Sequence, residues 1–303
     1  MTFLQNVAIL LSPVAFHTPL RIKSEPMDIA GLRIWNWIVG VLRSISFLFF
    51  VIVSSSFCQT AQTFITAGDQ YFHQYDMANA FEAYQKASQM DSTNFDALWK
   101  MAETLIELGN ELPKSLDQKT KYLEAEAVAR KAVNLNPNHF RGHVALALAF
   151  DRLASTQSGS ERVHTLNLMR IETEKALKLN DKCSRGFWLL GKWHREMANA
   201  SWLAKTWSRL FDGSFPASSY KDAAANFQHC VELDDTTMVY RLDLGKTFVL
   251  LEQWDDVKTE FDKALDMKSL GKNDRKYQRD AARYLEWLAA KRFSELKDAV
   301  EEY

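Results

Sequence analysis

Small and large apolar residues occur along this chain at fixed spacings, and the same set of spacings is repeated. Gly68 and Gly245 are each followed, after twelve, sixteen and nineteen residues, by a compact, an aromatic and a small residue. The followers are Ala80, Tyr84 and Ala87 in the first case and Val257, Phe261 and Ala264 in the second. The 34-residue tetratricopeptide repeat (TPR) has this order of sizes on its two helices. The pattern therefore predicts a stack of helical hairpins.

The same register extends through five repeats. They run over residues 64–87, 98–132, 143–176, 187–230 and 241–264. The second, third and fourth repeats carry extra residues between their two helices, around Gly109, around Ser155 and after Gly191. The third repeat is the least regular, because Met169 and Thr173 occupy its small and aromatic positions.

A C-terminal segment after the fifth repeat has apolar residues at helical spacing, namely Ala281, Tyr284, Leu285 and Leu288. The last hairpin of a solenoid needs a half-polar helix to cover its apolar face. We expect residues 274–302 to form this cap as one or two helices. The predicted fold is all-α: a right-handed superhelix of about five TPR hairpins over residues 62–303, ending in a capping helix.

Residues 1–61 have the composition of an N-terminal leader. The apolar run FLFFVIV follows Arg33 and Arg43 and precedes three serines and Cys58, an order typical of a secretory signal. Its apolar core is shorter than the ~20 residues that span a bilayer as a helix. We therefore favour a signal cleaved near Cys58 or Ala61, with an uncleaved membrane anchor as the alternative.

A signal normally starts close to its charged region, so we expect Met27 to be the true start. Either form of leader would make the protein secreted, periplasmic or membrane-anchored. The alternative is a cytoplasmic protein.

Composition limits the classes of partner. The chain has 47% hydrophobic and 25% charged residues with 11 Gly and 6 Pro, as expected for an ordered, mostly helical body. Its net charge of -1 lacks the cationic excess that nucleic acid requires, so no nucleic-acid partner is expected. Three cysteines do not form a disulfide framework. A bridge between Cys183 and Cys230 would need an oxidising compartment.

No catalytic, cofactor or metal site is expected, because the chain has no phosphate-binding glycine motif and no HExxH motif. His143 and His194 fall on core-facing positions, where a buried, hydrogen-bonded histidine is the simpler interpretation. An enzyme is therefore not predicted.

Binding of a partner is better supported than catalysis, because the first helices of stacked TPR hairpins line a concave groove. The groove residues expected to contact a partner are Trp99, Glu103, Arg185, Trp188, Lys192, Arg195 and Lys246. The groove would be acidic at one end and basic at the other. An extended peptide or a lipid headgroup could lay its anionic part on the basic end, whereas the plainer alternative is an ordinary mixed-charge surface.

The insertion after Gly191 carries a second candidate surface. Its apolar residues share one helical face opposite Lys205 and Arg209, and they are Leu203, Trp207, Leu210 and Phe211. Such a helix could lie on a membrane or bind a partner, although packing on its own repeat is the simpler expectation.

Residues 187–247 resemble the regulator of microtubule dynamics family. The positions that carry the resemblance are Leu190, Gly191, Lys192 and Trp193, then Ala200, Ser201 and Trp202, then Leu210, Phe211, Gly213 and Pro216. The likeness extends more loosely over residues 64–290 and leaves out the leader. It departs in the turn, where Asp212, Ser214 and Phe215 lengthen the run.

The resemblance implies a TPR-like interaction protein. Animal members of that family are associated with microtubules and spindle poles, and some are tied to organelle membranes. Microtubule regulation in the cytoplasm or on an organelle membrane is thus the alternative to an exported scaffold, since an exported protein would not meet tubulin.

Overall fold

The computed structural model describes residues 60–113, 116–199, 217–269 and 273–301. All of them belong to the unit Gln59–Tyr303. Within these residues the chain forms twelve helices and no strand, which confirms the all-α prediction. The leader and most of the insertion after Gly191 lie outside the described residues, so the expectations about them stay predictions.

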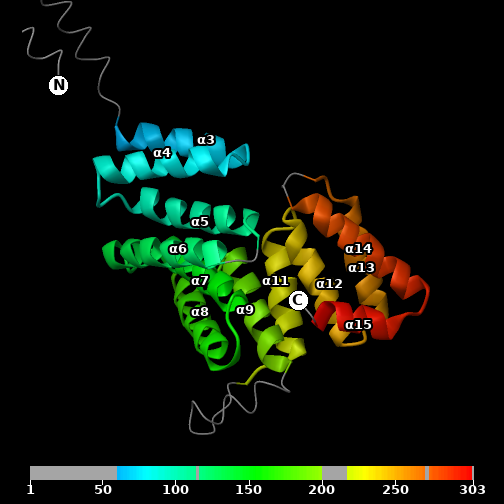
Figure 1. The fold of residues 1–303 in the computed structure, drawn as a ribbon. Helices are drawn as coiled ribbons and strands as arrows, with labels where there is room; N and C mark the ends of the chain where they lie inside the picture. Colours follow the sequence, from blue (N-terminus) through cyan, green and yellow to red (C-terminus); the bar gives the residue numbers. More distant parts are fainter. Residues whose placement is uncertain (1–59, 114–115, 200–216, 270–272, 302–303) are drawn as a thin grey trace, which may run out of the picture. The chain divides into compact units, whose positions relative to one another are not determined.

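The helices pair in sequence as hairpins that follow one another along a curved path (Figure 1). The five predicted hairpins are α3 (Ala61–His73) with α4 (Met77–Met90), α5 (Phe95–Glu111) with α6 (Leu116–Leu135), α7 (Phe140–Ser155) with α8 (Gly159–Leu179), α9 (Ser184–Ala198) with α11 (Tyr220–Leu233), and α12 (Met238–Leu250) with α13 (Trp254–Asp266). The cap consists of α14 (Asp274–Ala289) and α15 (Phe293–Glu301). The TPR prediction is confirmed.

In four of the five hairpins a glycine of the first helix faces an aromatic ring of the second. A Cβ atom at Gly68 would lie 2.5 Å from the Tyr84 ring, and a Cβ atom at Gly245 would lie 2.5 Å from the Phe261 ring. Real Cβ atoms do not approach this closely, so the ring occupies the space that a side chain would need. Phe261 is fully buried and Tyr84 is nearly so. The small residue thus sets how closely the two helices approach.

The extra residues of the second and third repeats are mostly helical. α5 and α6 have 17 and 20 residues, against 13 and 14 for α3 and α4. In this longer hairpin Gly109 faces Tyr122, with a Cβ-to-ring distance of 2.5 Å. In the third repeat Met169 and Thr173 are fully buried at the irregular positions.

The cap repeats the turn of the regular hairpins. Tyr75, Glu252 and Lys291 all have φ near +60° (59°, 59° and 58°), at the turns after α3, α12 and α14. In the last case the N–H of Arg292 donates to the carbonyl of Trp287 at 2.8 Å, the bond of a Schellman-type helix end. The α14–α15 pair is therefore built like a further TPR hairpin.

Two of the expectations for single residues can be compared with the structure. His143 is buried and bonded through both ring nitrogens, as expected, whereas His194 is only half-buried and its buried Nδ1 lacks a hydrogen-bond partner. Cys183 and Cys230 are both buried and free, so no bridge joins them.

His143 is held in its charged form by two acceptors. Its Nδ1 lies 2.6 Å from Glu172 Oε2 and its Nε2 lies 2.9 Å from the Pro137 carbonyl oxygen. Neither partner can donate a proton there, so both ring nitrogens donate. The bond to Glu172 raises the pKa of His143 against the opposing effect of burial.

Replacing Gly245 with Ala should lower the free energy of unfolding by about 1–3 kcal/mol, because the added Cβ overpacks against Phe261. Urea denaturation of the variant measures this. Gly142→Ala is the matched control, since its Cβ would lie 3.3 Å from Phe95 and needs only a small adjustment. Adding Phe261→Leu should recover part of the loss. Equal stability of the two glycine variants would contradict the packing account.

The free energy of unfolding should fall as the pH rises through the raised pKa of His143. The stabilisation is complete below the ordinary histidine pKa of about 6.5 and is lost above the folded-state value. Urea titrations between about pH 6 and about pH 9 should show this slope. His143→Gln should flatten it, while the same change at exposed His164 should not. An unchanged slope in His143→Gln would refute the assignment.

Candidate binding channel

Pockets on the concave side adjoin one another through shared lining residues, and together they are here called the channel. The mouth, about 500 Å³, is walled by residues of α3, α5, α7, α9 and α12, including Phe72, Trp99 and Arg185. A neck of about 160 Å³ shares Phe72 and Arg185 with the mouth. The neck shares Arg152, Trp188 and others with an inner hollow of about 450 Å³, here called the basic chamber.

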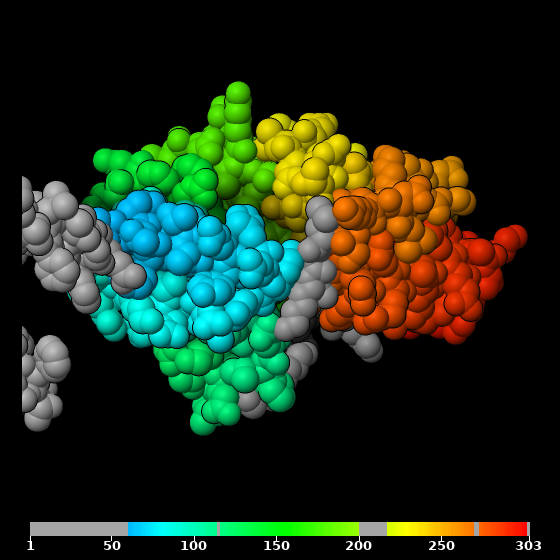
Figure 2. All heavy atoms as spheres, turned by 90° about the horizontal axis from the view of Figure 1, so that it is seen from above, coloured from blue at the N-terminus to red at the C-terminus, as the bar shows by residue number. Residues whose placement is uncertain are grey.

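A side pocket of about 360 Å³ adjoins the neck through Phe72 and Tyr277. Phe72 belongs to the first hairpin and Tyr277 to the cap, so the two ends of the superhelix contribute to the same walls. Figure 2 shows the first hairpin in blue and cyan and the C-terminal helices in orange and red on one face of the molecule. The solenoid curves enough to make its groove a channel.

All seven expected groove residues line this channel. Trp99, Glu103 and Arg185 wall the mouth. Trp188, Lys192, Arg195 and Lys246 wall the basic chamber. The structure therefore brings them together on one concave surface, while their contact with a partner remains a proposal.

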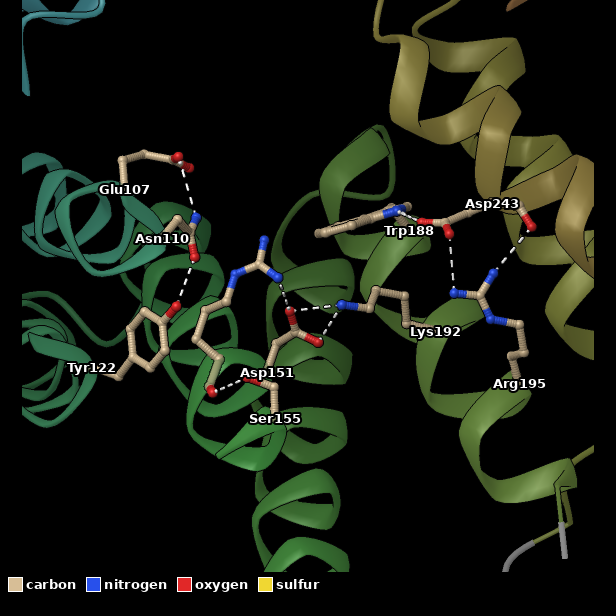
Figure 3. A network of polar contacts seen from close by, with 10 residues as sticks. Glu107, Asn110, Tyr122, Asp151, Ser155, Trp188, Lys192, Arg195 and Asp243 are labelled. Carbon is tan, nitrogen blue, oxygen red and sulfur yellow. Dashed lines mark hydrogen bonds and ion pairs between the residues drawn. The ribbon is translucent and has the colours of Figure 1, made fainter. Parts of the chain in front are cut away.

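Three of the expected cations have acidic partners inside the channel. Figure 3 shows two of these pairs, those of Lys192 and Arg195. Lys192 Nζ lies 2.7 Å from Asp151 Oδ2, and Arg195 donates to Asp243 Oδ1 at 3.0 Å. Arg185 donates to Glu103 Oε1 at 2.9 Å across 82 residues of sequence, at the boundary of mouth and neck. The cations are thus held in place rather than left to move in solvent.

Asp243 is the residue on which the inner side chains converge. Its Oδ2 accepts from Trp188 Nε1 at 2.8 Å, and its backbone oxygen accepts from Arg195 at 3.2 Å. Burial alone raises the pKa of Asp243, but the charges of Arg195, Lys246 and Lys192 outweigh it and hold the pKa at about 2. Burial lowers the pKa of Lys246 to about 8, against the attraction of Asp243. The carboxylate therefore organises the chamber wall.

The mouth differs from the acidic end that was expected. Asp69 is there, but Lys100 Nζ binds it at 2.6 Å and Tyr84 donates to it at 2.7 Å. Lys100 lies one position beyond Trp99, outside the expected groove positions, and it still reaches the channel. The acidic part of the channel is instead the side pocket. Its wall contains three carboxylates, those of Glu107, Glu111 and Asp274, and one cation, that of Arg185.

Comparison with known proteins agrees with the repeat architecture. The family model described as "Regulator of microtubule dynamics protein 1-3" matches residues 64–289, which include α4 to α14 and most of α3. The chain belongs to this family. The resemblance inferred from residues 187–247 is thereby confirmed, and the matched range agrees with the expected 64–290.

Named relatives are distant in sequence. Regulator of microtubule dynamics protein 1 of Bos taurus is 21% identical over 276 residues, covering 88% of this chain and 87% of the relative. The Homo sapiens protein 1 is 23% identical, covering 62% of this chain and 60% of the relative. Protein 3 of Rattus norvegicus is 23% identical, and the match covers 61% of this chain but only 40% of that longer relative.

Solved structures show the same fold. A thermophilic TPR protein of Thermus thermophilus aligns with a TM-score of 0.58 at 16% identity, covering 74% of this chain and 99% of that one. A chain of the APC/C hetero-tetramer Cut9–Hcn1 aligns with a TM-score of 0.56 at 15% identity, covering 84% of this chain and 42% of that one. These likenesses concern the fold alone.

Some residues that line the channel of this family member could not be predicted from their positions in the repeats. Asp243 lies next to an expected groove position, and only the approach of α9 to α12 brings Trp188 and Arg195 to it. Tyr277 comes from the cap, to which no groove position was assigned. Burial raises the pKa of Tyr277 to about 12, so its hydroxyl stays protonated in the channel wall.

Asp243→Asn should lower the free energy of unfolding by about 3 kcal/mol, because Arg195 and Lys246 would lose a buried counter-charge. The stabilisation from Asp243 is present above the ordinary aspartate pKa and is lost as the pH falls toward 2, so the difference between wild type and variant should shrink in acid. Denaturant titrations at neutral and acid pH measure both effects. Exposed Asp235→Asn is the control, and an equal effect of the two variants would contradict the role of Asp243.

Proposed function

We propose that this member of the regulator of microtubule dynamics family is a non-enzymatic scaffold that holds a segment of a partner protein in its channel. The observation that carries the proposal is the row of adjoining pockets, which share lining residues and are walled by the first helices of all five repeats and by the cap. TPR stacks act through such extended concave surfaces.

The chemistry of the channel suits an extended polypeptide. Trp99 and Tyr240 wall the mouth, and Arg141 lies over the Trp99 ring at 4.7 Å. Tryptophan, tyrosine and arginine are the residue types that dominate protein-binding sites. The ion pairs of Arg185 and Lys192 hold their side chains in position, which reduces the entropy lost on binding.

The relatives' names favour a partner in the microtubule system. The proposed location is then the cytoplasm, at microtubules or a spindle pole. Neither the chain nor its body has a net positive charge, so attraction to an acidic polymer would depend on cations concentrated locally, as in the basic chamber.

The non-enzymatic part of the proposal rests on the scaffold fold and on how the channel's charged groups are used. In the part of the chain that the structure describes, no group of three or more His, Cys, Asp or Glu residues is placed to hold a metal ion. The acidic groups of the channel interior, such as Asp151 and Asp243, are engaged in ion pairs.

Export or membrane anchoring remains a prediction from the leader. No helix among the described residues is long and apolar enough to cross a bilayer. The insertion helix with Trp207, proposed as a membrane or partner contact, lies in residues that the structure does not describe.

Val239→Trp in the full chain should weaken partner binding, because Val239 is half-buried in the walls of both neck and chamber and an indole there would obstruct the channel. Co-sedimentation with polymerised tubulin measures binding. We expect the wild type to sediment with microtubules and the variant to bind roughly tenfold or more weakly, a change of about 1.4 kcal/mol or more.

Val239→Ala, which opens the same place, is the matched control and should bind normally. Absence of wild-type sedimentation would refute the microtubule partner. Normal sedimentation of Val239→Trp, with an unchanged melting temperature, would refute the channel as the binding surface.

A further inference from the structure

We propose that the mouth of the channel binds an acidic residue of the partner segment, and that Arg141 receives the carboxylate of that residue. This inference deepens the proposed scaffold function and rests on it. Arg141 is the second residue of α7, and its exposed side chain lines the mouth. It lies outside the seven residues that the sequence indicated as partner contacts.

Two aromatic rings hold the guanidinium group of Arg141 in place. Its Cζ atom lies 4.7 Å from the centre of the Trp99 ring and 5.5 Å from the centre of the Phe140 ring. Trp99 is itself fixed, because it is buried and its Nε1 donates to Asp96 Oδ1 at 2.8 Å. A guanidinium group stacked on a ring keeps its N–H donors at its edge, where they can bind both oxygens of one carboxylate. Stacking therefore prepares Arg141 for an acidic ligand.

The N–H donors of the Arg141 side chain are available. Among the residues that the structure describes, Arg141 stacks on rings but forms no ion pair and no side-chain hydrogen bond. Arg185 and Arg195, by contrast, donate to carboxylates of the protein itself. A partner's carboxylate would therefore add a charge-assisted hydrogen bond at Arg141 without breaking one that the protein already makes.

The three carboxylates of the mouth already have donors. The pairs are Asp69 with Lys100, Glu103 with Arg185, and Asp234 with the hydroxyl groups of Thr236 and Thr237. Lys182, on the loop before α9, is a second exposed cation of the mouth that forms no ion pair within the described ranges. When the two ion pairs cancel, Arg141 and Lys182 remain against Asp234 alone. The mouth therefore carries a net positive charge.

The charge of Arg141 acts across the gap between two repeats. Burial raises the pKa of the Cys183 thiol at the start of α9, whereas the backbone amide of Gly186 and the charges of Arg185 and Arg141 oppose this effect. Cys183 lines the mouth together with both arginines. The positive field at this wall thus comes from α7 and α9 together.

The wall beside Arg141 also has room for an apolar side chain. Val144 follows one turn later on α7, and Phe72 of α3 lines the same pocket. Phe72 is only partly buried, so a partner side chain would remove apolar surface from water. The volume of about 500 Å³ is in the range of pockets that enclose ligands. We therefore expect the acidic residue to stand next to a large apolar one.

A protein segment fits this place better than an anionic membrane surface. Arg141 belongs to the wall of a concave pocket, which a protruding chain can enter and a flat layer of headgroups cannot. The carboxylates of Asp69, Glu103 and Asp234 in the same wall would oppose the dense negative charge of such a layer. A single carboxylate can bind Arg141 and avoid them.

Fluorine NMR of the full chain labelled with 5-fluorotryptophan tests the proposal, because Trp99 supports Arg141 and gives a resonance of its own. The variant Trp99→Phe assigns that resonance. The probe is the peptide Gly-Gly-Glu-Phe-Gly-Gly with both ends blocked, so that its only charge is the side-chain carboxylate. We expect the Trp99 resonance to shift to saturation, with an affinity that falls as salt is added. The same peptide with Gln in place of Glu should bind roughly tenfold more weakly or worse.

Arg141→Gln should weaken binding of the Glu peptide roughly tenfold, because it removes the guanidinium group from an exposed position. Arg279→Gln is the matched control, since it makes the same change at an exposed position of α14 outside the channel walls. Wild-type affinity in Arg141→Gln would overturn the proposal, and so would equal binding of the Gln peptide or the absence of saturable binding.

The site of binding is tested in the same spectra. A peptide that shifts the resonance of Trp188, in the neck and chamber, but not that of Trp99 would overturn the assignment to the mouth. Binding to phosphatidylcholine vesicles containing phosphatidylserine that is lost in Arg141→Gln, without binding of the Glu peptide, would overturn the proposal in favour of a lipid surface.

Microtubule co-sedimentation of the same variants separates this inference from the proposed function. If Val239→Trp weakens sedimentation while Arg141→Gln sediments normally, the inference about the mouth fails and the scaffold proposal stands. If the Glu peptide binds at Arg141 but the wild type does not sediment with microtubules, the microtubule partner fails and the inference about the mouth stands.

Discussion

The close contact between a glycine and an aromatic ring, found across four of the five hairpins, is the constraint on which the rest of the structure depends. At Gly191 a Cβ atom would lie 2.8 Å from the Phe227 ring, and Gly68, Gly109 and Gly245 show the same contact with their own rings. A side chain there would force the helices apart. The angle and spacing of one hairpin determine where the next can stack, so a small change would accumulate along the solenoid.

The accumulated curvature creates the channel. The α14–α15 pair has the turn of a regular hairpin, and it continues the curve until Tyr277 shares walls with Phe72 of the first repeat. A segment needed to cover the last apolar face thus also helps to enclose the groove. Enclosure changes the electrostatics, because charges that would be solvated in an open groove interact more strongly here.

Ion pairs in the channel wall join different repeats. Lys192, Arg195 and Arg185 are paired with carboxylates of other repeats, and these pairs tie α9 to α5, α7 and α12. Lys246 lies in the same wall, where the charge of Asp243 opposes the effect of burial on its pKa. These ion pairs hold the shape of the channel wall.

The spacing of small and aromatic residues by itself determined the hairpins, their number, the cap and the concave positions, because TPR packing depends on residue size at fixed intervals. It also determined the family, through residues 187–247. It could not determine that the groove closes into a channel, that Lys100 binds Asp69, or that Asp243 joins Trp188 to Arg195. Those features depend on small rotations between successive hairpins, which bring together side chains from distant repeats, and no local spacing in the sequence records them.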